Sequence, residues 1–217
     1  MSAHAAVGLA DRGRPDAVLR DDGPLALAAG RALGGAVPLP ALALLLAGPA
    51  VLLAAVVIAG GTAPLGLAAA VLAWLILTAG AASARRPRAA FEWTVPPLVR
   101  LGEYVALLWL AAIEGPHALP AAFAFLAALA YRHYDLVYRL RHRGDAPPAW
   151  LNRLALGWDG RLVLAWALLA LGALPAAMYA WAGVLGVASV AETVVAWRRF
   201  EASGRPAEYE TAEDEDE

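Results

Sequence analysis

Residues 32–84 read ALGGAVPLPALALLLAGPAVLLAAVVIAGGTAPLGLAAAVLAWLILTAGAASA, a stretch of 53 residues without a single Asp, Glu, Arg or Lys. A helix that spans a bilayer needs roughly 20 apolar residues, so this stretch is long enough for two spans. The segment Gly60-Gly61-Thr62-Ala63-Pro64 divides it. We therefore predict spanning helices over about residues 39–59 and 65–82, joined as a tight hairpin.

The rest of the chain predicts four more spans and one short helix. The third span is expected at residues 98–113, and the fourth at 118–131 with a polar extension to residue 143. The apolar segment 162–197 would be about 54 Å long as one helix, against ~30 Å for the bilayer core. Gly172 and Pro175 break it into two spans. A short amphipathic helix is expected at residues 24–33, with Asp22 as its cap and Pro24 in its first turn.

The arginines predict the orientation of these helices. Cytoplasmic loops carry an excess of basic residues, and six spans place the juxtamembrane arginines on one side. The opposite loops then carry only Glu114 and His117 as titratable residues. The expected fold is an all-α, multi-pass helix bundle in the cell membrane, with about six transmembrane helices and both termini cytoplasmic. The arginines that decide the orientation are Arg85, Arg86, Arg88, Arg139, Arg141, Arg143, Arg153, Arg161, Arg198 and Arg199.

Composition agrees with a membrane protein and excludes several classes of function. The chain is 61% hydrophobic and 17% charged, and it has no cysteine, so disulfides and thiolate chemistry are excluded. Its net charge of -2 is unevenly distributed. Residues 1–205 are net basic, whereas residues 206–217 contain seven acidic residues. No nucleic-acid-binding motif is present. We expect a mobile cytoplasmic arm at residues 1–23, a membrane domain at 24–200 and a disordered acidic tail at 201–217.

Polar residues at the cytoplasmic ends of the expected helices are the candidate functional residues. Arg100 and Glu103 share a helix face and are expected to pair, because an isolated charge inside a span is costly. Arg132, Asp135, Arg139 and Arg143 form one charged stripe, with Tyr131, Tyr134 and Tyr138 beside it and His133 on another face. Further along the chain, Asp159 and Arg161 open the fifth span, and Glu192 lies inside the sixth.

These residues also have simpler interpretations. Juxtamembrane arginines set topology in most membrane proteins, Asp159 is well placed to cap its own helix, and the tyrosines and tryptophans are suited to anchoring in the membrane interface. The Arg100/Glu103 pair and Glu192 favour a polar site, because ionisable groups inside spans usually line one. If the cluster is one site, it suits an anion, because guanidinium groups bind phosphate bidentately.

The roles that follow are those of a phosphate site. Substrate binding is assigned to Arg100, Arg132, Tyr138, Arg139 and Arg161, and acid–base or catalytic roles to Glu103, His133, Asp135 and Asp159. Asp135 and Asp159 are the candidate ligands of a Mg²⁺ cofactor. The chain has no P-loop, no nucleophile elbow, no HExxH zinc motif and no paired-aspartate signature of CDP-alcohol phosphotransferases.

Several of these segments together resemble a known family. The strings RDDGP (20–24), EWTVPP (92–97), RHYD with VYR (132–139), APP (146–148) and GWDGR (157–161) are similar to an actinobacterial integral-membrane domain of unknown function. The similarity covers about residues 20–200. Members are often fused behind a CDP-alcohol phosphatidyltransferase domain. The resemblance implies actinobacterial origin and a link to phospholipid or phosphoglycan assembly, although this chain lacks the transferase.

Three functions remain open from the sequence. The first is binding or processing of a phosphorylated lipid, or its phosphate donor, at the cytoplasmic membrane face. The second is a non-catalytic membrane scaffold or partner of a CDP-alcohol phosphotransferase. The third is a small transporter or flippase, which only Glu192 and the Arg100/Glu103 pair favour. Whether the chain is an enzyme, and whether it forms a homo-oligomer, are left open.

Overall fold

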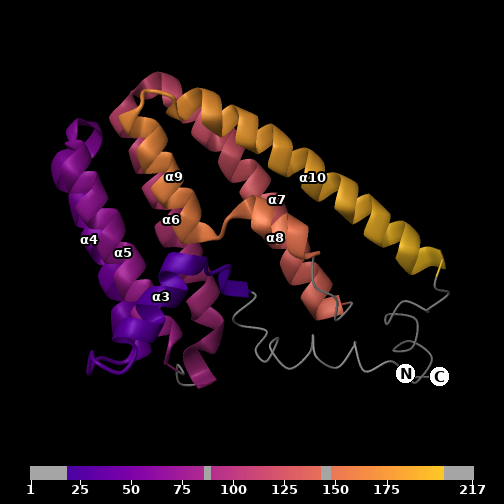
Figure 1. The fold of residues 1–217 in the computed structure, drawn as a ribbon, viewed down its shortest axis with the longest axis horizontal. Helices are drawn as coiled ribbons and strands as arrows, with labels where there is room; N and C mark the ends of the chain where they lie inside the picture. The colour runs from indigo at the N-terminus through magenta and orange to yellow at the C-terminus, as the bar shows by residue number, and fades with distance from the viewer. Residues whose placement is uncertain (1–18, 86–88, 143–147, 203–217) are drawn as a thin grey trace, which may run out of the picture.

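The computed structural model describes residues 19–85, 89–142 and 148–202 as an all-α structure, as the sequence predicts. Figure 1 shows the helices in chain order. Their bounds are α3 Pro24–Leu33, α4 Ala41–Ala59, α5 Leu65–Ser83, α6 Val95–Glu114, α7 Leu119–His142, α8 Ala149–Ala155, α9 Trp158–Ala170 and α10 Leu174–Ala202, with short 3₁₀ turns η1 Gly60–Thr62, η2 Ala89–Thr94 and η3 Pro116–Ala118.

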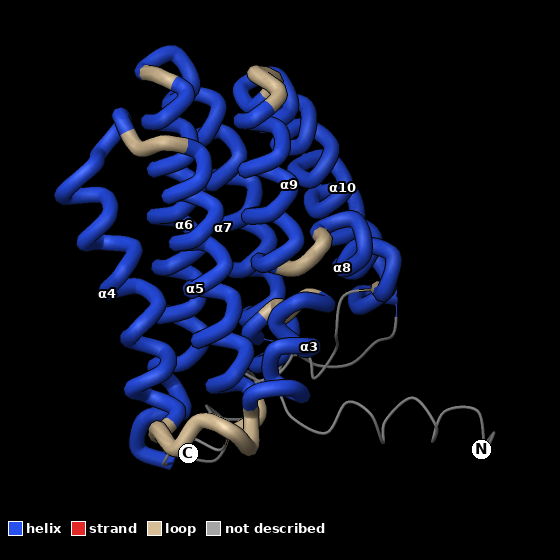
Figure 2. Tube along the Cα trace, turned by 60° about the vertical axis from the view of Figure 1, so that its left-hand side comes forward, coloured by secondary structure: helices blue, strands red, loops and turns tan. Residues whose placement is uncertain are grey.

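The long helices run alternately up and down. The connections α4–α5, α6–α7 and α9–α10 turn at one end of the bundle, and α3 lies at the other, which we call the α3 end (Figures 1 and 2). Helix α3 packs against α5 and α9, α6 packs against α4 and α9, and α10 lies along α7. This arrangement brings the start of α6 and the start of α9 to the α3 end together with α3.

The helix bounds agree closely with the sequence. Helix α3 has the predicted bounds, with Pro24 in its first turn, and the turn after Leu171 divides the last apolar segment as Gly172 and Pro175 predict. Helix α8 was not predicted. Helices α4, α5, α6 and α10 are long and apolar enough to cross a membrane. Helix α7 does not meet the same criterion, and the 13 residues of α9 extend only about 20 Å, short of the ~30 Å bilayer core. The count of six spans therefore stays a prediction.

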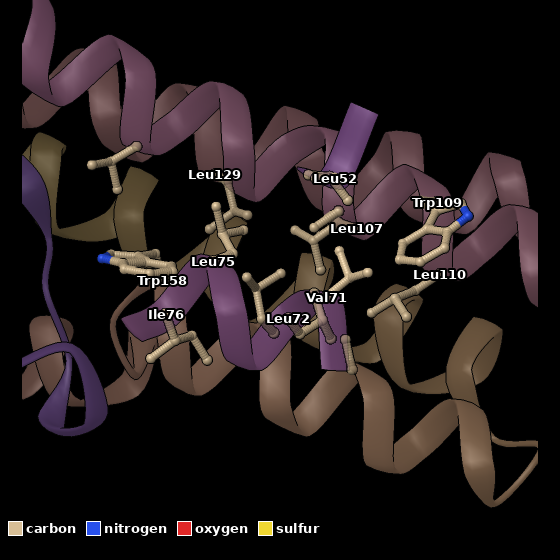
Figure 3. Packing of buried hydrophobic residues seen from close by; sticks show 14 of the residues in the cluster. Leu52, Val71, Leu72, Leu75, Ile76, Leu107, Trp109, Leu110, Leu129 and Trp158 are labelled. Atoms are coloured by element: carbon tan, nitrogen blue, oxygen red, sulfur yellow. The ribbon is translucent and has the colours of Figure 1, made fainter. Parts of the chain in front are cut away.

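The buried core follows the bundle axis. Figure 3 shows side chains from α4 to α7 in contact along it, among them Leu52, Leu75, Leu107 and Leu129. Outward-facing residues are apolar as well. Val57 and Ile58 near the end of α4 are both 84% exposed, which suits a surface in contact with lipid rather than with water.

Small residues allow α3 to lie close to α5. A Cβ atom on Gly30 would lie 2.9 Å from the carbonyl oxygen of Gly80, and one on Gly80 would lie 2.5 Å from the carbonyl oxygen of Ala26. Helix α3 therefore contacts α5 through backbone, as glycines at helix crossings permit.

Several predictions concern residues outside the described ranges. These are the arm over residues 1–18, the acidic tail over residues 203–217, and Arg86, Arg88 and Arg143. The last five residues of the expected arm, 19–23, are described, and they contact α6, α7 and α9. These residues therefore pack against the bundle, while the division into arm, membrane domain and tail stays a prediction.

Candidate functional site

The carboxylate of Asp21 is the centre of a buried polar site at the α3 end. Nη1 and Nη2 of Arg132 lie 3.1 and 3.2 Å from its two oxygens, and Nη2 of Arg161 lies 2.9 Å from Oδ2. Nε2 of His133 is 3.7 Å from the same oxygen. Two guanidinium groups from different helices thus converge on one carboxylate, an arrangement that binds anions strongly.

Arg161 connects Asp21 to the interior of the bundle. Its Nε donates to Glu103 at 2.5 Å, and its Nη1 donates to the carbonyl oxygen of Ala155 at 2.8 Å. Arg161 is 0% exposed and Glu103 is 1% exposed. A buried charge without a partner is strongly destabilising, so these two carboxylates stabilise the buried guanidinium of Arg161.

Helix α7 supplies the other side of the site. Nη2 of Arg132 also donates to the side-chain oxygen of Asn152 at 2.9 Å, which connects α7 to α8. The hydroxyl of Tyr104 and Nδ1 of His133 share a hydrogen bond of 2.8 Å between α6 and α7. We call this group the Asp21 cluster. It comprises Asp21, Glu103, Tyr104, Arg132, His133, Asn152 and Arg161.

The backbone around Asp21 is unusual. Asp21 has φ of +55°, a left-handed conformation that few residues other than glycine adopt readily. The carbonyl oxygen of Asp21 accepts the N–H of Trp158 at 3.1 Å. Gly157, with φ of +77°, lies so close that a Cβ atom there would be 2.6 Å from Cα of Gly23. The segment before α3 and the link before α9 therefore hold each other in place.

The charges of the cluster lower the pKa of the Asp21 carboxyl. Burial by itself raises it, because the charged form loses its water. The polar contact with His133 and the charges of Arg161 and Arg132 act in the opposite direction and prevail. The net result is a pKa well below the usual value, so Asp21 is ionised at neutral pH.

Asp159 and Asp22 have other partners than the sequence predicts. Asp159 caps α3 instead of its own helix, because its Oδ1 accepts the N–H of Gly23 at 2.6 Å and its Oδ2 accepts those of Leu25 and Ala26. Asp22 does not cap α3. It accepts hydrogen bonds from Trp158 Nε1 and Arg20 Nε, both at 2.8 Å. The predicted self-cap by Asp159 and the predicted cap by Asp22 are therefore both wrong.

The expected ion pair between Arg100 and Glu103 is also absent. Glu103 faces α9 and binds Arg161, while Nη2 of Arg100 donates to the carbonyl oxygen of Leu19 at 2.8 Å. The two residues lie on one helix but bind different neighbours. The buried carboxylate of Glu103 needs a cation in contact with it, and that cation is Arg161. Arg100 thus holds the chain that leads into Asp21.

The predicted arginine stripe on α7 contributes to two separate groups. Arg139 Nε donates to Asp135 at 2.7 Å, and its Nη1 lies 3.6 Å from Oε1 of Glu192 on α10. Seven residues separate Arg139 from Arg132, or about 10 Å along a helix axis. We call Asp135, Arg139 and Glu192 the Asp135 cluster. Tyr138 lines a pocket together with Asp135 of this cluster.

Magnesium binding stays a prediction. Asp135 and Asp159, the expected ligands, belong to different sets of contacts, and both oxygens of Asp159 already accept backbone N–H groups. Within residues 19–85, 89–142 and 148–202, no group of three His, Cys, Asp or Glu side chains is arranged to hold a metal ion.

Sequence reasoning did not assign Asp21, Tyr104 or Asn152 to the site. Asp21 lies in the string RDDGP, where its neighbour Asp22 has the better position for a helix cap. Its contacts with Arg132 and Arg161 join residues more than 100 positions apart in the chain. The sequence did contain one signal, because Asp21 belongs to the string RDDGP, on which the family resemblance partly rests.

Comparison with known proteins identifies the family but no activity. No curated protein and no solved structure matches the chain. The actinobacterial origin and the fusion to a phosphatidyltransferase, which the resemblance implies, stay predictions. A family model, described as a family of unknown function, matches residues 11–214, which is most of the chain. The chain therefore belongs to that family, DUF5941.

Proposed function

We propose that the protein is an integral membrane protein that binds a phosphorylated lipid at the α3 end, with the phosphate held by Arg132 and Arg161 in place of the Asp21 carboxylate. The observation that carries this proposal is the convergence of two buried guanidinium groups on a single carboxylate. Phosphate oxygens accept the same bidentate hydrogen bonds from arginine as carboxylate oxygens do.

The position of Asp21 supports its exchange with a ligand. Asp21 lies outside the long helices, in the turn before α3, and its backbone is in a left-handed conformation. Strained backbone of this kind is often found at ligand sites. Withdrawal of Asp21 leaves the two buried guanidinium groups of Arg132 and Arg161 with one carboxylate, that of Glu103, which binds Arg161. An incoming phosphate supplies the missing negative charge.

An apolar groove beside the cluster suits the lipid chain. The groove has a volume of about 630 Å³ and lies between α3, α5 and α9, with Leu25, Ala29, Ala73, Ile76 and Trp166 in its lining. Its lining residue Leu25 donates its N–H to Asp159, which lies two residues before Arg161 on α9. A lipid with its phosphate at Arg132 and Arg161 thus has an apolar surface for an acyl chain nearby.

The proposal concerns binding and assigns no reaction. Two of the expected catalytic residues already have structural partners. Glu103 binds Arg161, and Asp159 binds the start of α3. Proton transfer by His133 and the location of the site at the cytoplasmic face stay predictions. So does the link to phospholipid or phosphoglycan assembly.

A second candidate function is a non-catalytic scaffold, such as a membrane partner of a CDP-alcohol phosphotransferase. One observation favours it, namely that Arg161 donates to Glu103, Ala155 and Asp21 at once. A charge network with this many internal partners holds helices in one arrangement without any ligand. The two candidates differ in whether phosphate competes with Asp21.

Lipid retention tests the proposal. The full chain is purified in maltoside detergent and offered phosphatidic acid or diacylglycerol with identical acyl chains, and bound lipid is counted by native mass spectrometry. We expect at least tenfold preference for phosphatidic acid, and we expect Arg132→Lys to remove most of it, because lysine cannot bind bidentately. Arg31→Lys, at an exposed arginine of α3, is the control and should retain the preference.

A second pair of variants tests whether the apolar groove holds the lipid chain. Ala73→Trp fills the groove between α3, α5 and α9 and should lower retention of both lipids. Ala180→Trp, at an exposed alanine that lines a smaller groove between α8, α9 and α10, should not lower it. Equal retention of the two lipids, or an unchanged preference in Arg132→Lys, would leave the scaffold as the better account.

A further inference from the structure

A second pocket lies between α7 and α10 and is lined mostly by aromatic residues. Its volume is about 310 Å³, enough for a small polar group. None of its lining residues belongs to the Asp21 cluster, and the phosphate proposal does not use it. Its lining residues are Tyr131, Tyr134, Asp135, Tyr138, Thr193 and Trp197.

The lining is suited to a cation. Tyr131, Tyr134 and Tyr138 are three and four residues apart, so they share one face of α7. The rings of Tyr134 and Tyr138 stack with centroids 6.4 Å apart, and Trp197 faces them from α10 as a lining residue. Aromatic faces attract ammonium and guanidinium groups through the negative charge of the ring surface.

The charges behind the lining have the sign that a cation requires. The Asp135 cluster contains two carboxylates, of Asp135 and Glu192, and one guanidinium, of Arg139, which leaves one net negative charge. Arg139 is buried and is not a lining residue, whereas Asp135 lines the pocket. The pocket therefore combines several aromatic rings with one carboxylate, and none of its lining residues is basic.

We propose that this pocket binds an alkylammonium group, with Asp135 as the countercharge and Tyr134, Tyr138 and Trp197 as the aromatic surface. The ammonium comes either from a lipid headgroup or from a soluble amine. The site is separate from the Asp21 cluster, so ammonium binding here can be tested independently of phosphate binding at the Asp21 cluster.

Choline and its neutral isostere 3,3-dimethylbutan-1-ol, which carries carbon in place of nitrogen, are the matched probes. The full chain is kept in maltoside micelles, which contain no ammonium, and binding is measured by isothermal titration calorimetry. We expect choline to bind and the isostere to bind at least tenfold more weakly. Equal binding of the two would show an apolar pocket without cation selectivity and would overturn the proposal.

Variants then locate the site. Asp135→Asn removes the countercharge and should weaken choline binding about tenfold or more. Because it also removes a partner of Arg139, Tyr134→Leu serves as a second variant at a residue that is 70% exposed. It should weaken binding about three- to thirtyfold, the range of a cation–π contact. Trp150→Leu, at a half-exposed tryptophan outside the pocket, should leave binding unchanged.

Competition between phosphatidylcholine and choline distinguishes a lipid headgroup from a soluble amine as the ligand. In nanodiscs of phosphatidylglycerol, soluble choline should bind as it does in micelles. Addition of phosphatidylcholine should compete with choline if the ligand is a lipid headgroup and should have no effect if it is a soluble amine. Either result is compatible with the site, whereas unchanged choline binding in both Asp135→Asn and Tyr134→Leu would refute it.

Discussion

Asp159, in the first turn of α9, accepts the backbone N–H of Gly23 at 2.6 Å and thereby caps a helix that precedes it by more than 130 residues. Its other oxygen accepts the N–H groups of Leu25 and Ala26. The first N–H groups of a helix have no partner within the helix, and here one side chain satisfies three of the groups at this end. The cap also positions Asp21, two residues before Gly23, over α7 and α9.

Replacement of Asp159 should therefore destabilise the whole α3 end. We expect Asp159→Ala to cost about 2 kcal/mol, the upper end for a lost cap, because the carboxylate is fully buried. The measurement is thermal unfolding in maltoside micelles. Glu114→Gln, at the opposite end of the bundle, is the control and should leave the midpoint unchanged. If both variants unfold like the parent, the cap contributes nothing.

The close approach of Gly157 to Gly23 leads to a second prediction. Alanine at position 157 is unfavourable for two reasons. The backbone φ of +77° strains any residue with a side chain, and the Cβ atom would lie 2.6 Å from Cα of Gly23. We expect Gly157→Ala to lower stability by about 2 kcal/mol or more. Gly66→Ala is the matched control, since its Cβ meets no atom within 4 Å, and it should raise stability by about 0.5–1 kcal/mol. Equal effects of the two variants would contradict this geometry.

The lowered pKa of Asp21 predicts how stability depends on pH. A carboxyl whose pKa is lower in the folded state stabilises the fold above its ordinary pKa of 3.8, and this contribution is lost as the pH falls below that value. The groups that face Asp21 are Arg132, His133 and Arg161. We expect the unfolding midpoint of the parent to fall more steeply than that of Asp21→Asn as the pH is lowered from 4 to 2. Parallel pH profiles would show that Asp21 is not responsible.

The orientation of the six predicted spans can be tested because the chain has no cysteine. With both termini cytoplasmic, a thiol introduced by His117→Cys, in the turn between α6 and α7, should react with an impermeant reagent added to intact cells. A thiol introduced by Ala202→Cys, at the end of α10, should react only after lysis. Labelling of Ala202→Cys in intact cells would show that the predicted topology is wrong.

The helices could be predicted from the sequence because their signals are local. Runs of apolar residues set the spans, and Pro24, Gly60-Gly61 and Gly172 mark ends that depend only on the conformations of those residues. Helix α8 was missed because seven residues are too few to show a periodic pattern.

The site was only partly predictable because its partners are distant in the chain. Spacing correctly placed Asp135 and Arg139 together, since residues four apart meet on any helix. The same rule was wrong for Arg100 and Glu103, because burial drew Glu103 to Arg161 on another helix. Arg132 binds Asp21 and not its neighbour Asp22. This pairing depends on the left-handed turn at Asp21, which only the folded chain shows.

The most direct test of phosphate binding by Arg132 and Arg161 is rescue of Asp21→Ala by inorganic phosphate. Removal of this carboxylate should lower stability by about 3 kcal/mol or more, because two buried guanidinium groups lose a partner. We predict that phosphate raises the unfolding midpoint of Asp21→Ala far more than chloride at equal ionic strength does, and that it has little effect on the parent or on Asp22→Ala. If phosphate and chloride act alike on Asp21→Ala, or if phosphate stabilises Asp22→Ala equally, Arg132 and Arg161 do not form a phosphate site.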